Sequence, residues 1–265
     1  MRRLVVCVAV LVLCVANQAV FGQDEEASAL AKATQNPVAD LISLPLQSNF
    51  NTGVGGKDDL QYVLNVQPVI PTGISEDWNL INRLILPVMY QPEITPGVGK
   101  EWGLGNSVYQ GFISPKEAKS VVWGVGPVVQ IPTSTDDQLF GLGEWGLGPT
   151  LVALVMPGPW VIGSTIYNVW SVESSDVNLF LWQYFINYNF PNGAYLTSAP
   201  IITANWEADS DQRWTVPFGI GAGKVFKIGK QPINSSLQAY YNVEKPDLTG
   251  ADWQIRLQFQ LLFPK

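Results

Sequence analysis

The sequence predicts an all-β fold, a transmembrane antiparallel up-and-down β-barrel of about 12 strands. Three observations predict it: side chains alternate between apolar and polar along strand-length segments, connections alternate in charge, and tryptophans gather at segment ends. The final segment, 253–263, shows the first pattern most clearly, because its odd-numbered residues are apolar while Gln254, Arg256, Gln258 and Gln260 are polar. One face of this strand is therefore apolar and the other polar. Strands of soluble sandwiches share this pattern, but its repetition along the chain, with aromatic ends, is typical of a membrane barrel.

The beginning of the chain predicts export from the cytoplasm. Met1-Arg2-Arg3 precedes an apolar run that extends from Leu4 to Ala16 and is too short to cross a bilayer as a helix. We therefore predict a signal peptide over residues 1–22, with cleavage after Gly22 or, alternatively, after Ala16.

Two absences narrow the chemistry of the exported protein. Both cysteines, Cys7 and Cys14, lie within the predicted signal peptide, and the chain contains no histidine. Thiolate and imidazole nucleophiles, bases and metal ligands are therefore missing. We expect no enzyme activity, no catalytic residue, no metal site and no cofactor. A net charge of −7 argues against a nucleic-acid partner.

The remaining chain divides into a short leading segment and one barrel domain. Residues 23–43 form a periplasmic N-terminal segment with a short helix expected over Ala27 to Lys32. We expect this segment to lead into the barrel from outside, and the alternative is a plug inside the lumen. Residues 44–265 contain no linker and form the outer-membrane β-barrel.

Twelve strands are expected in this domain, and an even number is usual for bacterial barrels. Most of them exceed the roughly 9–11 residues that a tilted strand needs to cross a bilayer. The predicted limits are 44–53, 60–71, 78–90, 102–113, 120–131, 145–156, 160–171, 177–190, 194–206, 213–227, 232–243 and 252–263.

The connections between these strands alternate in character. Every second connection is acidic, and together these hold most of the 22 carboxylates of the chain; they are 53–59, 91–101, 132–144, 172–176, 207–211 and 244–252. The intervening connections are mostly short turns rich in glycine, proline and asparagine. Because the signal peptide places both termini in the periplasm, the acidic loops are expected to face outward. We expect them to be solvated, and divalent-cation binding by Asp136-Asp137 or Asp209-Ser210-Asp211 is the alternative.

Aromatic residues predict two girdles at the membrane surfaces. Tryptophans at the acidic ends of strands are Trp102, Trp145, Trp170, Trp206, Trp214 and Trp253, those near the other ends are Trp78, Trp123 and Trp160, and only Trp182 is central. Phe112, Phe190, Tyr195, Phe226 and Phe263 are expected to join the periplasmic girdle.

Six prolines lie inside predicted strands, where each removes a hydrogen bond from a closed sheet. They are Pro68, Pro87, Pro127, Pro149, Pro200 and Pro217. We expect bulges or kinks at these positions. A further hypothesis is that apolar solutes leave sideways through the wall. It requires interrupted strand pairing at Pro127 and Pro200.

The polar residues that alternate with the lipid-facing set are candidates for the lumen. Those expected to line a solute path are Asn65, Gln67, Arg83, Asn187, Gln238, Asn242, Arg256 and Gln258. Because the last strand pairs with the first at closure, Arg256 and Gln258 should lie near Gln47 and Asn49. Two interpretations stay open: a polar filling that satisfies itself with hydrogen bonds, and a narrow, weakly cationic path.

Five segments together resemble a known family. They are Gln35 to Gln47, Gln67 to Pro71 with Asp77 to Ile81, Gly158 to Trp160, Ser198 to Trp206, and Gln238 to Asn242. From about Thr34 to Lys265 the chain is similar to the bacterial outer-membrane family called putative MetA-pathway of phenol degradation, also labelled neuromedin U. The resemblance implies an outer-membrane barrel and uptake of small hydrophobic or aromatic molecules, and it supplies no catalytic residues.

The expected function is a porin-like transporter of the cell outer membrane of a Gram-negative-type bacterium, passing small, hydrophobic or aromatic solutes passively. Its partners would be outer-membrane lipid and a small-molecule solute, with no nucleic acid; the sequence makes no prediction of an oligomer. The first alternative is a structural or surface-interaction barrel with a packed lumen and no transport. A membrane hydrolase is the second alternative, and it lacks the usual histidine base.

Overall fold

The computed structural model describes residues 21–55, 58–94, 97–117, 120–174, 176–247 and 249–264. The predicted signal peptide, except for its last two residues, lies outside this part of the chain. Among the described residues, no helix is both long enough and apolar enough to span a membrane.

The described chain consists of one helix followed by strands. Helix α2 spans Phe21–Thr34. The strands are β1 Ile42–Val54, β2 Asp59–Val66, β3 Val69–Gly73, β4 Trp78–Gln91, β5 Glu101–Leu104, β6 Ser107–Pro115, β7 Val122–Ile131, β8 Gly146–Val155, β9 Trp160–Ser171, β10 Asn178–Asn189, β11 Ala194–Ser198, β12 Ile201–Asn205, β13 Trp214–Ile228, β14 Gln231–Glu244 and β15 Trp253–Phe263.

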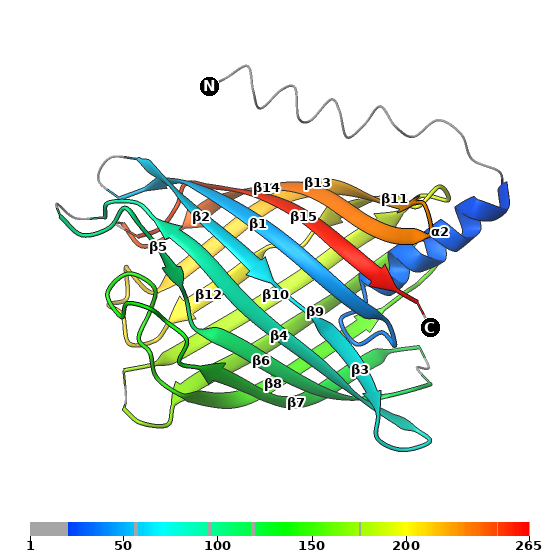
Figure 1. Cartoon of the computed structure of the whole chain (residues 1–265), viewed down its shortest axis with the longest axis horizontal. Coiled ribbons are helices and arrows are strands. Elements are labelled where there is room, and N and C mark those ends of the chain that lie inside the picture. The colour runs from blue at the N-terminus through cyan, green and yellow to red at the C-terminus, as the bar shows by residue number, and fades with distance from the viewer. Residues whose placement is uncertain are drawn as a thin grey trace.

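These strands form one closed antiparallel barrel of twelve strands, which confirms the predicted fold class. Three of the twelve are interrupted, so that β2 with β3, β5 with β6, and β11 with β12 each act as one strand of the wall. Figure 1 shows the strands running obliquely around the barrel, each beside its sequence neighbour. The observed limits agree closely with those predicted, and each expected segment corresponds to one strand or one interrupted pair.

The barrel closes where β15 pairs with β1. Gln258 lies opposite Gln47, and Arg256 lies opposite Asn49. This register confirms the neighbours that were expected from the sequence. It also brings the polar residues of the last strand onto the same interior face as those of the first.

The two ends of the barrel differ. The long acidic connections lie at one end, here called the loop end, and the short connections and the C-terminus lie at the other, here called the turn end (Figure 1). Helix α2 packs at the turn end, where Ala31 is buried with Tyr195, Val225 and Leu262. Lys32 Nζ donates a hydrogen bond of 2.6 Å to the Gly158 carbonyl in the turn before β9.

The residues that follow helix α2 enter the turn end of the barrel, while the helix packs at that end, so the segment combines the expected lead-in with part of the alternative plug. Val38 is only 6% exposed and packs with Ile81, Phe112 and Phe185 in an apolar cluster inside the turn end. The helix is also longer than the predicted Ala27 to Lys32. The physical reason is burial, because Val38 loses its contact with water when it packs against the apolar side chains inside the turn end.

The outer surface of the wall is apolar. Leucine, isoleucine, valine and phenylalanine side chains stay 36% or more exposed along most strands; examples are Leu151, Ile166, Phe218 and Leu237. Contiguous apolar surface of this extent is not left in water by soluble proteins. It matches a wall that faces lipid.

Aromatic side chains mark both ends of this apolar surface. Trp206 and Trp214 pack at 5.4 Å between ring centroids at the loop end, and Trp160 packs on Tyr188 at 4.9 Å at the turn end. None of the ten tryptophans, all of which the structure describes, is buried. The predicted girdle is wrong at two positions, because Phe112 and Tyr195 point inward and are at most 5% exposed.

All six prolines lie at irregularities of the wall. Pro68 and Pro200 fall in the breaks that divide β2 from β3 and β11 from β12, and Pro217 follows a register shift in β13. Pro87 lies opposite the break between β5 and β6. Pro127 and Pro149 face each other across β7 and β8, where the outer pairings of both strands are interrupted. Interrupted pairing at Pro127 and Pro200 meets the condition for a sideways exit, and that exit stays a hypothesis.

One glycine allows a close approach of two strands beside Pro127. A methyl group at Gly126 would overlap the carbonyl oxygen of Gly111 on the neighbouring strand β6. Only glycine permits this backbone approach. Glycine at position 126 therefore allows close contact between β7 and β6 beside Pro127.

Candidate functional site

The interior of the barrel has one side where buried apolar side chains cluster among polar ones such as Gln110, Gln130 and Thr165, and another side that is polar. Ile81, Phe112, Val152 and Val161 are fully buried on the side formed by β4 to β10. The side formed by β1, β14 and β15 is polar, and its residues that are at most 8% exposed include Gln47, Asn49, Asn234, Gln238, Arg256 and Gln260. Sequence reasoning predicted the polar side and missed the apolar one, because an inward valine gives the same pattern as an outward valine.

A cavity of about 170 Å³ lies where the two sides meet, toward the turn end. The N-terminal segment borders it with residues from Ala33 to Leu41. Its apolar wall includes Phe185, Val69 and Ala199, the last two packed against the apolar cluster. Its polar wall comprises Gln47, Gln67, Arg83, Gln183, Asn187, Thr197, Asn234, Ser236, Gln238, Arg256, Gln258 and Gln260.

Six of the eight predicted path residues line this one cavity: Gln67, Arg83, Asn187, Gln238, Arg256 and Gln258. Asn65 does not line it, although its register opposite Gln47 places it on the interior face. Asn242 lies near the loop end, where its Nδ2 donates to the Ala251 carbonyl at 2.7 Å. The fold thus gathers residues that are up to 191 positions apart in sequence, from Gln67 to Gln258.

Arg256 reaches past β14 and β13 along the inner face of the wall to the break between β11 and β12. Its Nη1 donates to the Ala199 carbonyl at 2.9 Å, in the break between β11 and β12. Its Nε donates to Asn49 Oδ1 at 3.2 Å and its Nη2 to Gln254 Oε1 at 2.9 Å. The guanidinium also lies over the Tyr240 ring at 5.0 Å, and the Tyr240 hydroxyl accepts a hydrogen bond of 3.0 Å from the Ala199 N–H. Both backbone groups of Ala199 are thereby satisfied by side chains from β14 and β15.

A chain of side-chain amides continues from this bridge toward the loop end. Gln254 donates to Asn51 at 3.1 Å, Asn51 donates to Gln61 at 2.8 Å, and Gln61 donates to Gln91 at 2.7 Å. These residues come from β15, β1, β2 and β4. Such a network is the self-satisfying polar filling that was one of the two interpretations of the sequence.

Arg83 forms fewer hydrogen bonds than Arg256 among the described residues. Among the described residues its hydrogen-bond partner is Gln67, whose Oε1 accepts from Nη2 at 2.6 Å. A guanidinium carries five N–H donors in a planar fork. Arg83 is half-buried and lines the cavity, so its remaining donors are available to whatever fills that space.

The charge of the cavity is one-sided. Two arginines are among the residues that line it, and no aspartate, glutamate or lysine is. No described carboxylate forms an ion pair with either arginine. Uncompensated positive charge in a low-dielectric interior creates a potential that attracts anions.

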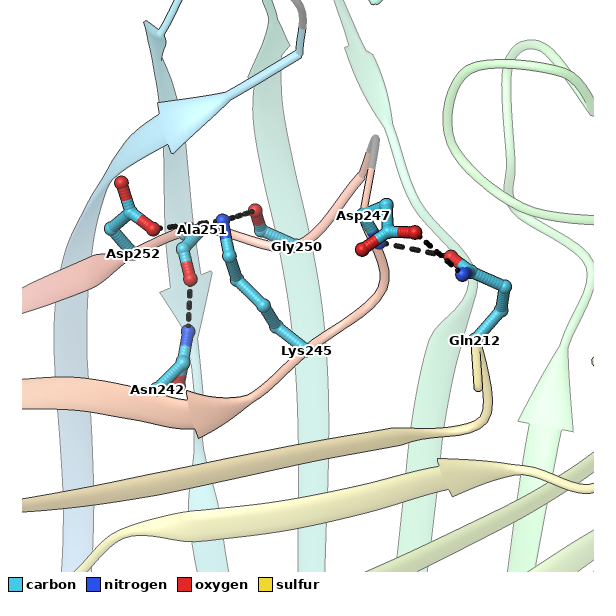
Figure 2. A network of polar contacts seen from close by, with 7 residues as sticks. All are labelled: Gln212, Asn242, Lys245, Asp247, Gly250, Ala251 and Asp252. Carbon is cyan, nitrogen blue, oxygen red and sulfur yellow. Dashed lines mark hydrogen bonds and ion pairs between the residues drawn. The ribbon is translucent and has the colours of Figure 1, made fainter. Parts of the chain in front are cut away.

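Polar contacts hold the loops in place at the loop end. Figure 2 shows Lys245 bridging its own loop, with Nζ 2.8 Å from Asp252 Oδ1 and 3.0 Å from the Gly250 carbonyl. Gln212 and Asp247 join two loops by paired hydrogen bonds of 3.0 and 2.9 Å. These contacts fix the loops on either side of β13 and β14.

The acidic loops use their carboxylates for their own structure. Asp136 Oδ1 accepts from the backbone N–H groups of Gln138 and Leu139 at 2.9 and 3.0 Å, and Asp137 Oδ1 accepts from Gly143 N–H at 2.9 Å. Within the part of the chain that the structure describes, no group of three or more Asp, Glu, His or Cys side chains is arranged to hold a metal ion.

Glu144 is held by two serines beside β9. Hydrogen bonds from Ser171 and Ser174, both 2.6 Å, lower the pKa of Glu144 from its usual value. The ionised carboxylate therefore fixes the start of the connection between β9 and β10.

The sequence matches no protein-family model and no curated protein. Among solved structures, the fold is similar to the COG4313 outer membrane channel from Pseudomonas putida F1, with a TM-score of 0.66, 14% sequence identity, and 84% of this chain and 96% of that chain covered. That likeness shows a shared barrel fold.

Two further structures are more distant. Outer membrane phospholipase A from Escherichia coli has a TM-score of 0.44 and 12% identity, covering 84% of this chain and 96% of that chain. The CymD monoaromatic hydrocarbon channel has a TM-score of 0.44 and 9% identity, covering 94% of both chains. Similarity at this level does not bear on the function of this chain.

Proposed function

We propose that the protein is a passive channel in the outer membrane of a Gram-negative-type bacterium, which admits small hydrophobic or aromatic solutes and is not an enzyme. The observation that carries this proposal is the reversed polarity of the wall, apolar outside and largely polar inside around a cavity. An apolar band between two aromatic girdles fits a bilayer. Twelve strands lie between filled eight-stranded barrels and open barrels of sixteen or more, which favours a restricted pore.

One likeness supports the proposal. The barrel shares its fold with the outer membrane channel of Pseudomonas putida, which is consistent with the MetA-pathway-like barrel expected from the sequence. With this assignment, the loop end faces outward and the turn end, with helix α2, faces the periplasm.

The cavity supports solutes of one-ring size. At about 170 Å³ it is comparable to the ~150 Å³ cavity that admits benzene in an engineered protein. Phe185, Val69 and Ala199 offer a surface for an apolar ring. A solute with a polar substituent fits better than a hydrocarbon, because a hydrocarbon would leave the amides of the opposite wall without partners.

A packed structural barrel is the second candidate, and one observation favours it. Arg256 and Tyr240 both contact Ala199 across β13, and Arg256 also binds Asn49 and Gln254, so these side chains fill part of the lumen. In this reading the protein would act through its rigid, acidic loops.

Conductance separates the two candidates. The purified, processed full-length protein would be inserted into planar lipid bilayers, and its folded state checked by the gel mobility shift that barrels show on boiling. We expect discrete openings that phenol or benzoate reduces reversibly, while a disaccharide of larger size has no effect. Folded protein that inserts but neither conducts nor admits small aromatic solutes into vesicles would overturn the channel in favour of the packed barrel.

A further inference from the structure

Resting on the channel proposal, we propose that the cavity is a binding site for a small aromatic carboxylate, with Arg83 as the residue that receives the carboxylate. The resemblance to the family implies hydrophobic or aromatic solutes and does not require a charge. The inference comes from the side chains that meet in the cavity.

The charged side chains that line the cavity are positive. Arg83 and Arg256 both line the cavity, and its lining contains no acidic side chain. A cation taken out of water without a partner is unfavourable, so an anion that enters gains a favourable interaction with both guanidinium groups. A cationic solute meets repulsion from the same two groups.

The two arginines differ in how many of their hydrogen-bond donors are already used. Arg256 uses all three of its nitrogens on Asn49, Ala199 and Gln254 and is only 2% exposed. Arg83 is half-buried and has Gln67 as its hydrogen-bond partner among the described residues. Arg83 is therefore the one that presents free donors, and a guanidinium fork matches a carboxylate with two parallel hydrogen bonds.

The cavity also offers an apolar surface for the ring of the ligand. Phe185 and Val69 form an apolar wall in the same cavity, and Val69 lies directly opposite Arg83 in the pairing of β3 with β4. A ring stacked on this wall can carry a carboxylate toward Arg83. The volume of about 170 Å³ leaves room for one ring with one small substituent.

Binding to the folded protein in detergent tests the site independently of conduction. The probes are benzoate, benzyl alcohol as the uncharged ring of the same size, and acetate as the carboxylate without a ring, each titrated by calorimetry. We expect benzoate to bind at least about tenfold more tightly than either of the other two. Equal affinity for benzoate and benzyl alcohol, or no benzoate binding at all, would overturn the proposal.

Variants assign the carboxylate to Arg83. Arg83→Gln should weaken benzoate binding about tenfold or more, to the level of benzyl alcohol, and Arg83→Lys should lie between the two, because it keeps the charge and loses the fork. The matched control is Arg213→Gln, which removes a cation at the loop end, over Trp206, and should leave binding unchanged. If Arg83→Gln does not fold, Arg83→Lys decides alone, and wild-type affinity in a folded Arg83 variant would refute the assignment.

Bilayer recordings distinguish a failure of this site from a failure of the channel. In a salt gradient, the wild-type reversal potential should indicate a preference for anions that Arg83→Gln reduces. Benzoate binding through Arg83 in a protein that does not conduct would refute the channel and retain the site. Conduction that benzoate neither blocks nor changes, together with no binding, would refute the site and retain the channel.

Discussion

The Arg256 bridge makes the strongest prediction about stability. Arg256→Met keeps the aliphatic stem and removes the guanidinium from the interior of the barrel. The lost interactions are three hydrogen bonds, to Asn49, Ala199 and Gln254, and the stacking on Tyr240 at 5.0 Å. Because Arg256 is 2% exposed, water does not already replace these contacts in the native protein.

The magnitude follows from the kinds of contact. Hydrogen bonds from a charged donor contribute about 1.5–3 kcal/mol each, and a desolvated cation–π contact contributes about 2 kcal/mol. Removing the guanidinium also removes the unfavourable burial of an unpaired cation, which offsets much of this sum. We therefore expect a net loss of about 2–4 kcal/mol in the free energy of unfolding.

Urea unfolding in detergent micelles or lipid vesicles, followed by tryptophan fluorescence and by gel mobility, measures this loss. Arg213→Met is the matched control, since Arg213 forms one hydrogen bond of 3.2 Å to the Ala208 carbonyl and a cation–π contact of 5.5 Å at the loop end. We expect the control to lose about 1 kcal/mol or less. If Arg256→Met unfolds within about 0.5 kcal/mol of the wild type, the bridge contributes no net stability and the reasoning is wrong.

Three further predictions concern the wall, a loop and the N-terminal segment. Gly126→Ala should destabilise the barrel by about 1–3 kcal/mol, because its methyl overlaps a backbone carbonyl; an unchanged urea midpoint would contradict this. Ser171→Ala should raise the pKa of Glu144 toward its usual value, as NMR titration of the carboxyl would show. Since the folded pKa of Glu144 is lowered, its stabilising effect is present above the unfolded pKa and is lost as pH falls through the folded pKa. Gln35→Ala should make channel openings longer, because the N-terminal segment borders the cavity and this change removes the two amide hydrogen bonds of 2.9 Å that join the segment to Asn189. Unchanged open times would show that this contact does not hold the segment.

Local pattern was sufficient for the fold class and for most strand limits. The alternation from Trp253 to Phe263 appears as β15 itself, and the predicted neighbours of Arg256 are correct because closure is determined by strand order. The six prolines were correctly expected at irregularities, since each lacks the N–H that donates a ladder hydrogen bond.

The alternation of side chains along a strand did not by itself determine which face of the strand lies inside. Phe112 and Tyr195 looked like members of an aromatic girdle and instead lie in the interior. An apolar residue is compatible with lipid outside or with an apolar cluster inside, and the choice depends on what the opposite wall presents. Val38 shows the same limitation, because the cluster in which it is buried draws on six distant strands, β4 and β6 to β10.

The sequence by itself therefore determined a membrane-type barrel, its strands, its two chemically different ends and a set of polar interior candidates, because these depend on period, turn residues and charge along the chain. Tertiary structure alone decided that Arg256 reaches Ala199, that Arg83 is left with open donors, and that Phe185 faces the polar wall across one cavity. These are distances between residues far apart in sequence, and only closure of the wall brings such residues together.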